Sequence, residues 1–476
     1  MRWLACGAAM IMLLGMAAQG QESFTLDQGL TDYQVLQCDG NDLAAAECSG
    51  TAEELDGPVE ARVTGEDDEE ILAWHEIGQA AQGEWEGALA GIPAGGPYTV
   101  QFRLDGHEAQ AEQVLAGELW ILAGQSNMQG VGNMENVAQP HPRVHVFAMN
   151  DDWRLAEEPL HRRGESVDPV HNSDAAEGLE IDVTDWTKGA GLGLPFAKAR
   201  FEDTDRPVGL IPCAHGGTSM DQWDPARREE DGESLYGAMY RRFLEAGGEV
   251  AGVLWYQGES DSGAADAYED KFRDFIEAVR TDFDDPALPF YYVQIGPYAT
   301  TDDGAGWDTV QTAQTSIEKT MAGVAMTPSI DLVLDDPIHI GTEGLKTLGI
   351  RLADIAGRMD AGQQPPEASG PRLASVERRD SRFGSYLEVH FDGVEDGLEA
   401  TGGVRGFSLS DGDNEPLQPI YKQVITETDE GEVIQLWSNQ LPEDLHLWYG
   451  RGFFPDCTVT DGAGRALPVF GPVFVP

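Results

Sequence analysis

The chain is poor in cations, in cysteine and in long apolar runs. Lys and Arg number 30 among 476 residues, against 84 Asp and Glu, so the formal net charge is −54. A surface this acidic argues against nucleic acid and anionic membranes as partners, because both would repel it. Beyond the N-terminus no stretch reaches the roughly 18 apolar residues that a membrane span needs. The spacing of Cys and His contains no zinc motif, so we expect neither a metal nor another cofactor.

The N-terminal segment, residues 1–20, reads as a signal peptide. A basic residue precedes the apolar run Leu4–Met16, and Ala18-Gln19-Gly20 offers a small-x-small cleavage site. The alternative is a buried N-terminal helix. A signal peptide predicts a secreted or periplasmic protein. Cys38 and Cys48 lie ten residues apart in this exported chain, which favours a local disulfide.

The hydrophobic pattern changes twice and predicts three globular parts. Residues 21–114 alternate apolar and polar side chains between dense turns, as in a β-sandwich-like domain. From 115 to 360, apolar runs alternate with helical stretches, which predicts a parallel sheet with helical crossovers. A linker rich in Pro and Gly, 361–372, leads to a second β-domain, 373–476. Residues 156–194 lack periodicity and are either a functional insertion, such as a lid, or a flexible segment.

The central part contains the predicted secondary structure that places the motifs. Buried parallel strands are expected at 119–123, 208–214, 250–256 and 290–295. Helices are expected at 235–246, 265–280, 309–321 and 342–359, the last with Thr342 as N-cap. Open parallel sheets bind ligands at the carboxyl ends of their strands. Polar motifs that directly follow these strands are therefore the candidates for an active site.

Three residues of this kind can form a nucleophile and its activating pair. Ser126 follows the first parallel strand, and Gly124 before it allows a sharp turn that exposes the hydroxyl. A serine alone is a weak nucleophile and needs a base that an acid orients. Asp336 and His339, three residues apart, can supply both, with the carboxylate on one ring nitrogen and Ser126 on the other. The neighbouring Asp335 is a rival for the orienting role.

Acyl transfer also needs hydrogen-bond donors for the oxyanion. Gly216 and Gly217 follow the second parallel strand, and either backbone N–H could point at the site. Gln257 follows the next strand and could add its side-chain amide. The backbone N–H of Ser126 would complete this predicted oxyanion hole.

Several residues beside the motifs are candidates for substrate binding. Trp223 and Tyr256 could stack on a sugar ring, and His215 either contacts substrate or fills its loop. Glu259 either braces the loop after Gln257 or contacts the substrate. For an anionic sugar, the arginines at 227 and 228 are candidate partners of the carboxylate, or they face solvent.

Together these motifs resemble the sialate O-acetylesterase-like family of the SGNH hydrolase superfamily. The resemblance rests on Gly117-Glu118-Leu119-Trp120, Gly124-Gln125-Ser126-Asn127-Met128, Gly216-Gly217-Thr218-Ser219 and Trp255-Tyr256-Gln257-Gly258-Glu259-Ser260. It covers residues 115–360 and implies an α/β, flavodoxin-like three-layer domain, here flanked by N- and C-terminal all-β domains. It implies metal-free hydrolysis of sugar acetyl esters, with Ser126 as nucleophile, His339 as base and Asp336 as orienter. Gln257 stands where many members of the superfamily have Asn.

The predicted function is therefore that of a secreted serine carbohydrate esterase that acts through an acetyl-enzyme. The expected partner is an O-acetylated carbohydrate, either sialate or an acetylated polysaccharide such as xylan. A non-catalytic carbohydrate-binding protein is the alternative outside the enzymes, and the intact set of Ser126, Asp336 and His339 argues against it. The sequence leaves open the sugar and the oligomeric state.

Overall fold

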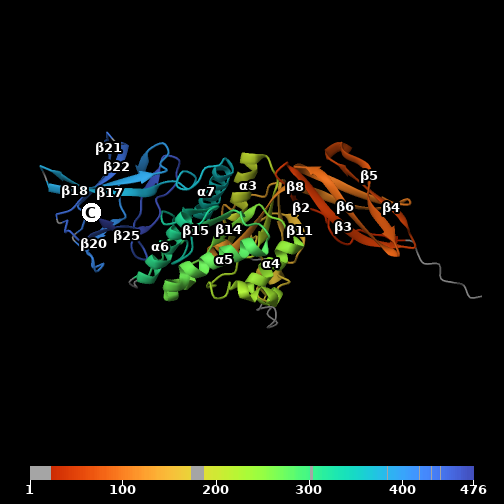
Figure 1. Ribbon diagram of the computed structural model, residues 1–476, viewed down its shortest axis with the longest axis horizontal. Helices are drawn as coiled ribbons and strands as arrows, with labels where there is room; N and C mark the ends of the chain where they lie inside the picture. Colours follow the sequence, from red (N-terminus) through yellow and green to blue (C-terminus); the bar gives the residue numbers. More distant parts are fainter. Residues whose placement is uncertain are drawn as a thin grey trace, which may run out of the picture.

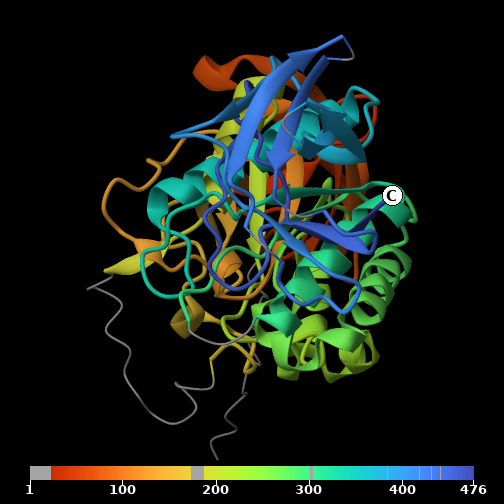
Figure 2. The ribbon, with the colours of Figure 1, turned by 90° about the vertical axis from the view of Figure 1, so that its left-hand side faces the viewer.

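The computed structural model describes residues 23–172, 187–300, 304–382, 384–417, 419–429, 431–439 and 441–476. The predicted signal peptide lies outside these ranges. Figure 1 shows an elongated molecule in which a helix-bearing centre separates two β-rich ends. Figure 2 looks along the long axis, with the C-terminal end nearest the viewer. None of the described helices has the length and apolar content needed to cross a membrane.

The central part is built on parallel strands of one sheet. They are β8 (His107–Gly124), β10 (Val144–Phe147), β13 (Val208–Pro212), β14 (Gly252–Tyr256), β15 (Phe290–Gln294) and β16 (Val324–Pro328). The order β13-β8-β14-β15-β16 is all parallel, β10 extends it beyond β13, and β11 (Trp153–Leu155) adds an antiparallel edge. In chain order the five strands read 2-1-3-4-5, the order of flavodoxin-like sheets. The three-layer arrangement of helices remains a prediction beyond this strand order.

The helices of the central part follow the strands. They are α1 (Ser126–Gln129), α3 (Gly193–Thr204), α4 (Leu235–Glu245), α5 (Tyr268–Asp282), α6 (Ala305–Thr320) and α7 (Thr342–Asp360), with 3₁₀ turns η2 (Arg163–Glu165), η3 (Pro225–Glu233) and η4 (Glu259–Ala267). Buried apolar residues recur at helical spacing in α7, at Leu345, Leu348, Leu352 and Ile355, and this stripe drives its packing. α7 packs against α3, β15 and β16. Its N-cap is Gly341, with Thr342 as the first helical residue.

The N-terminal β region is continuous with the central sheet through β8. Its strands are β1 (Ser23–Phe24), β2 (Val35–Gln37), β3 (Leu43–Glu53), β4 (Gly57–Thr64), β5 (Glu70–Ala81), β6 (Gly83–Pro93) and β7 (Gly95–Leu104), with the 3₁₀ turn η1 (Glu66–Asp68). They run in the order β1-β3-β6-β5-β4-β7-β8, and β1 and β3 also contact β8, so the sheet curls on itself. The predicted boundary between residues 114 and 115 therefore falls inside β8.

The C-terminal β region, residues 372–476, has its own apolar core. Its strands are β17 (Arg372–Ser381), β18 (Gly384–Asp392), β19 (Leu398–Ala400), β20 (Phe407–Ser410), β21 (Lys422–Thr428), β22 (Gly431–Trp437), β23 (Leu445–Tyr449), β24 (Val459–Asp461) and β25 (Phe470–Val475). They form small antiparallel sheets, β17-β18-β22-β21, β19-β24 and β20-β23-β25. Within the segment 156–194, β12 (Lys188–Ala190) pairs with β9 (Gly132–Asn133), and residues 173–186 lie outside the described ranges.

The spacing of Cys38 and Cys48 made a disulfide between them plausible, but the structure shows none. Both residues are free, buried thiols. Cys38 pairs across the sheet with Ala44, while Cys48 lies four residues further along β3. Four residues of strand span about 13 Å, which exceeds the roughly 7 Å between Cα atoms that a disulfide can bridge.

Candidate active site

The three predicted residues of the nucleophile system meet at the carboxyl edge of the parallel sheet. β8 ends at Gly124, and Ser126 opens the short helix α1. Gly124 has a φ of +130°, and a Cβ there would lie 2.3 Å from the Tyr256 carbonyl oxygen, so the turn into Ser126 requires glycine. Ser126 Oγ lies 2.9 Å from His339 Nε2.

His339 is oriented by the carboxylate of Asp336, as the three-residue spacing between them predicts. Its Nδ1 lies 2.8 Å from Asp336 Oδ2 and 3.0 Å from Oδ1. Partial burial raises the pKa of Asp336, but hydrogen bonds from the His339 ring and from the N–H groups of Ile338 and His339 outweigh it, so the net pKa is lowered. Asp336 therefore remains a carboxylate and favours the His339 tautomer that leaves Nε2 free to accept a proton. The rival Asp335 instead accepts from the N–H of Asn133 at 3.1 Å.

A cavity of about 520 Å³ opens over this pair. Its lining, as far as the chain is described, comprises Gln125, Ser126, Gln129, Val131, Arg163, Gly216, Gly217, Glu259, Ser260, Ile338 and His339. The N–H groups of Ser126 and Gly217 have no acceptor among the described residues. Gly217 has a φ of +74° and open space where a side chain would project. Both N–H groups thus meet the requirement for oxyanion donors, which must be unspent in the free enzyme.

Two predicted oxyanion donors have other tasks. The N–H of Gly216 donates to Gln129 Oε1 at 2.8 Å. A Cβ on Gly216 would lie 3.4 Å from that of Ser126, so Gly216 keeps the loop close to Ser126. Gln257 is fully buried. Its Nε2 donates to the Thr218 carbonyl at 3.0 Å and to Asp261 Oδ2 at 2.5 Å. Gln257 therefore supports the Gly217–Thr218 loop instead of reaching the cavity.

The prediction that Trp223 and Tyr256 bind a sugar ring is wrong, because both side chains are buried. Trp223 and Tyr256 have no exposed surface. Trp223 packs edge-on against Trp255 and donates its Nε1–H to Thr218 Oγ1 at 3.0 Å, and the Tyr256 hydroxyl bonds the Ser329 hydroxyl at 3.0 Å. Both rings therefore stabilise the core beneath the loops.

The remaining substrate-binding candidates differ in their access to the cavity. His215 is absent from the described lining, and its ring stacks on His171, with the Nδ1 atoms 3.2 Å apart. Glu259 lines the cavity, and its Oε1 accepts from Asn127 Nδ2 at 2.9 Å. Burial raises the pKa of Glu259, and the Asn127 hydrogen bond opposes that shift. Arg227 and Arg228 lie on η3 and pair with nearby carboxylates away from the cavity.

Three functional candidates emerge only from the structure. Asn127, next to Ser126, accepts the Ile340 N–H at 3.0 Å and so joins the serine turn to the histidine loop. Gln129 holds the Gly216 backbone, as described above. Asn127 lies within the serine motif and Gln129 directly follows it, which was the available signal. Arg163 lines the cavity from η2, in a segment without periodicity that gave no signal.

Comparisons with known proteins identify the family of the central part. The family model described as carbohydrate esterase, sialic acid-specific acetylesterase matches residues 116–358. A probable carbohydrate esterase of Arabidopsis thaliana is 32% identical over 262 residues, covering 50% of this chain and 88% of that protein. Human sialate O-acetylesterase is 24% identical over 234 residues, which cover 42% of this chain but only 43% of the human protein.

A solved structure supports the fold of most of the chain. The crystal structure of a carbohydrate acetylesterase from Xanthomonas citri matches with a TM-score of 0.67 and 21% identity, covering 94% of this chain and 98% of that one. At this identity the likeness shows the fold alone, including both β-rich ends. On the extent of the family match and the identity to the Arabidopsis protein, the chain belongs to the sialic acid-specific acetylesterase family of carbohydrate esterases and is a carboxylic ester hydrolase.

Proposed function

We propose that this chain removes O-acetyl groups from a carbohydrate through a Ser126–His339–Asp336 triad. The observation that carries the proposal is the continuous hydrogen-bonded line from Asp336 through both His339 nitrogens to the Ser126 hydroxyl, with distances of 2.8 and 2.9 Å. Heavy-atom distances in this range allow proton transfer between nucleophile and base. The family membership supplies the class of ester.

The reaction proceeds in two halves. Ser126 Oγ attacks the acetyl carbonyl carbon while His339 Nε2 takes its proton, and the oxyanion accepts hydrogen bonds from the N–H groups of Ser126 and Gly217. The proton then passes to the sugar oxygen, which leaves as an alcohol. Water attacks the acetyl-enzyme by the same route and releases acetate. Each oxyanion donor is expected to supply roughly 3 kcal/mol of transition-state stabilisation.

Arg163 favours an acidic sugar over a neutral one. It is the cation of the described cavity lining, which also holds Ser126 and His339, in a chain whose net charge is −54. A guanidinium matches the planar geometry of a carboxylate. Sialate carries a carboxylate and xylan backbones do not, so we place O-acetylated sialate first and acetylated xylan second.

The experiment compares acetate release from O-acetylated sialic acid and from acetylated xylan. We expect release from sialate by the wild type and none above background for Ser126→Ala. Arg163→Gln should raise KM for the sialate ester by roughly tenfold, the loss of about one charge-assisted hydrogen bond, and leave a neutral acetyl ester unaffected. Release that persists in Ser126→Ala contradicts the triad, while release from xylan alone contradicts only the choice of sugar. Export from the cell is part of the same proposal and is tested by locating the mature N-terminus.

A further inference from the structure

The loop between β16 and α7 carries both Asp336 and His339, and its base is embedded in the C-terminal β region. Ile330, the second residue after β16, is 4% exposed and belongs to the apolar core formed by that region. A residue of the catalytic part therefore completes the core of another part of the chain. Moving the C-terminal β region would displace the start of this loop.

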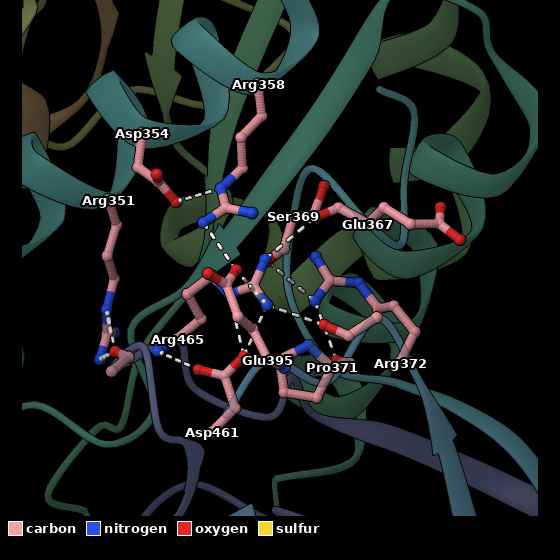
Figure 3. Close-up of polar contacts among 12 residues, drawn as sticks. Arg351, Asp354, Arg358, Glu367, Ser369, Pro371, Arg372, Glu395, Asp461 and Arg465 are labelled. Atoms are coloured by element: carbon pink, nitrogen blue, oxygen red, sulfur yellow. Dashed lines mark hydrogen bonds and ion pairs between the residues drawn. The ribbon is translucent and has the colours of Figure 1, made fainter. Parts of the chain in front are cut away.

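Arg351 of α7 ties the same base to the C-terminal β region. Its guanidinium donates to both carboxylate oxygens of Asp331, at 3.0 and 2.7 Å, and to the carbonyl of Gly464, at 2.9 and 3.2 Å. Arg351 is 9% exposed, and bidentate pairs shielded from water hold their geometry well. Figure 3 shows Arg351 at the edge of a polar network that joins α7 to Glu395, Asp461 and Arg465 of the C-terminal β region.

The tip of the loop has a second connection to the same region. The N–H of Tyr298 donates to the carbonyl of Phe453 at 2.5 Å, and the next N–H, of Ala299, donates to the carbonyl of Pro337 at 2.7 Å. The Phe453 ring also packs on Tyr298 and Trp307, with centroids 5.4 and 5.3 Å apart. Pro337 lies between the orienting acid and the base, so this chain of contacts ends at the catalytic residues.

We propose that the C-terminal β region positions His339 against Ser126, and that Arg351 is the principal positioning residue. On the other side, Asn127 fixes the loop to the serine turn through the Ile340 N–H. The loop is thus held between the nucleophile and the C-terminal β region, and the Ser126–His339 distance depends on both attachments. This inference rests on the proposed triad.

The size of the expected effect follows from the sensitivity of catalysis to geometry. A displacement of about 1 Å can cost on the order of 100-fold in rate. Arg351→Gln shortens the side chain and removes its charge, so it cannot donate to Asp331 and Gly464 together. We expect it to lower kcat by roughly 10- to 100-fold with a small change in KM, because substrate still binds while the base is displaced. Arg351→Lys, which keeps the charge, should restore part of the loss.

Arg358→Gln is the matched control. Arg358 lies about two turns further along α7 and contacts the same region through Glu395 at 2.7 Å and its own helix through Asp354 at 2.8 Å. Its described partners are outside the loop. We expect kcat to remain within about twofold of the wild type, since a partly exposed pair at this position does not reach His339.

The test measures kcat and KM for 4-nitrophenyl acetate, together with the midpoint of thermal unfolding, for the full-length variants. This ester needs no sugar contacts, so the result is independent of the natural substrate. Asp331→Asn, nearly the same shape as the original, provides a second route to the same contact if Arg351→Gln does not fold. Folded Arg351→Gln or Asp331→Asn protein with wild-type kcat would overturn the inference, as would an equal loss in Arg358→Gln. Activity that survives in Ser126→Ala would instead contradict the proposed triad itself.

Discussion

The two β-rich ends are attached to the esterase core in different ways. The N-terminal region shares its backbone with the core, because β8 runs without a break from His107 to Gly124, two residues before Ser126. The C-terminal β region is attached through side chains and loops, among them the contacts of Arg351 and Ile330. One end therefore fixes the Ser126 turn through main-chain hydrogen bonds, and the other contacts the His339 loop largely through side chains, which single substitutions can remove. We expect single substitutions to disturb the base more readily than the nucleophile.

The largest expected effect is a difference in kcat between variants of the two neighbouring aspartates, Asp336 and Asp335, on the base side. Asp336→Asn removes the carboxylate that lies 2.8 Å from His339 Nδ1, and it should lower kcat by about 10³- to 10⁴-fold because the imidazole loses its orienting charge. Asp335→Asn keeps an oxygen that can accept from the Asn133 N–H but removes the ion pair with Lys188 at 3.7 Å, and it should cost less than about tenfold. Steady-state hydrolysis of one acetyl ester by both variants checks this, and equal losses would contradict the assignment of Asp336.

The next variant tests whether every contact with the C-terminal β region matters for catalysis. Arg372 pairs with Glu318 of α6 through two hydrogen bonds of 2.7 and 2.9 Å, both side chains being buried. Arg372→Met leaves Glu318 buried without its partner and should lower the free energy of unfolding by about 3–5 kcal/mol. Chemical denaturation measures that loss. The folded fraction should keep the wild-type kcat, and a large fall in kcat would show that the whole interface, not the loop, sets the rate.

A pH-dependent effect is expected on the nucleophile side. Burial raises the pKa of the Glu158 carboxyl to about 7, although the N–H groups of Leu160 and Gly191 donate to it. Gly191 lies against Gly130 at the end of α1. Because the folded state binds this proton more tightly than the unfolded state, its contribution is complete below the ordinary pKa and is lost as pH rises toward 7. The free energy of unfolding should therefore fall by at most about 3 kcal/mol over that window.

Glu158→Gln tests this pH-dependent contribution to the free energy of unfolding. Its amide is neutral at every pH, so the slope of unfolding free energy between pH 5 and about 7.5 should be flatter than in the wild type. Urea unfolding at several pH values gives the slope directly. An unchanged slope would mean that Glu158 is ionised in the folded protein throughout this range.

The smallest effect concerns the residue that joins both sides. Asn127→Ala removes the donor to Glu259 and the acceptor of the Ile340 N–H. Unpaired buried groups of this kind cost about 1–3 kcal/mol, which thermal unfolding would detect. In the double variant Asn127→Ala and Arg351→Gln, the loss of kcat should be smaller than the two single losses combined, since both residues act on one loop. Fully additive losses would indicate that the two attachments work independently.

Residues whose role depends on local order were predictable from the sequence. The turn at Gly124, the proximity of Ser126 to His339 and the D-x-x-H pair follow from motif spacing and from the apolar runs that precede them. The helix predicted at 342–359 is found as Thr342–Asp360, because its apolar period is strong. The strands predicted at 119–123, 250–256 and 290–295 likewise fall on β8, β14 and β15.

Features that depend on tertiary packing were not predictable. Trp223 and Tyr256 lie beside the motifs in sequence, yet their rings point into the core, which no pattern of neighbours reveals. Gln257 forms hydrogen bonds with groups that only the folded loops bring near it. Arg163 comes from a segment without periodicity, and its place in the cavity is set by contacts distant in the chain. The break expected at residue 114 does not occur because β8 serves two sheets at once.

The most direct test of the role of Ser126 is covalent labelling with an organophosphate that reacts with activated serines, followed by peptide mapping. We expect complete loss of esterase activity with a single phosphoryl adduct on Ser126, and no labelled serine in Ser126→Ala or His339→Ala at the same exposure. Labelling at a different serine that accounts for the loss of activity, or full inactivation of the wild type without an adduct on Ser126, would contradict it.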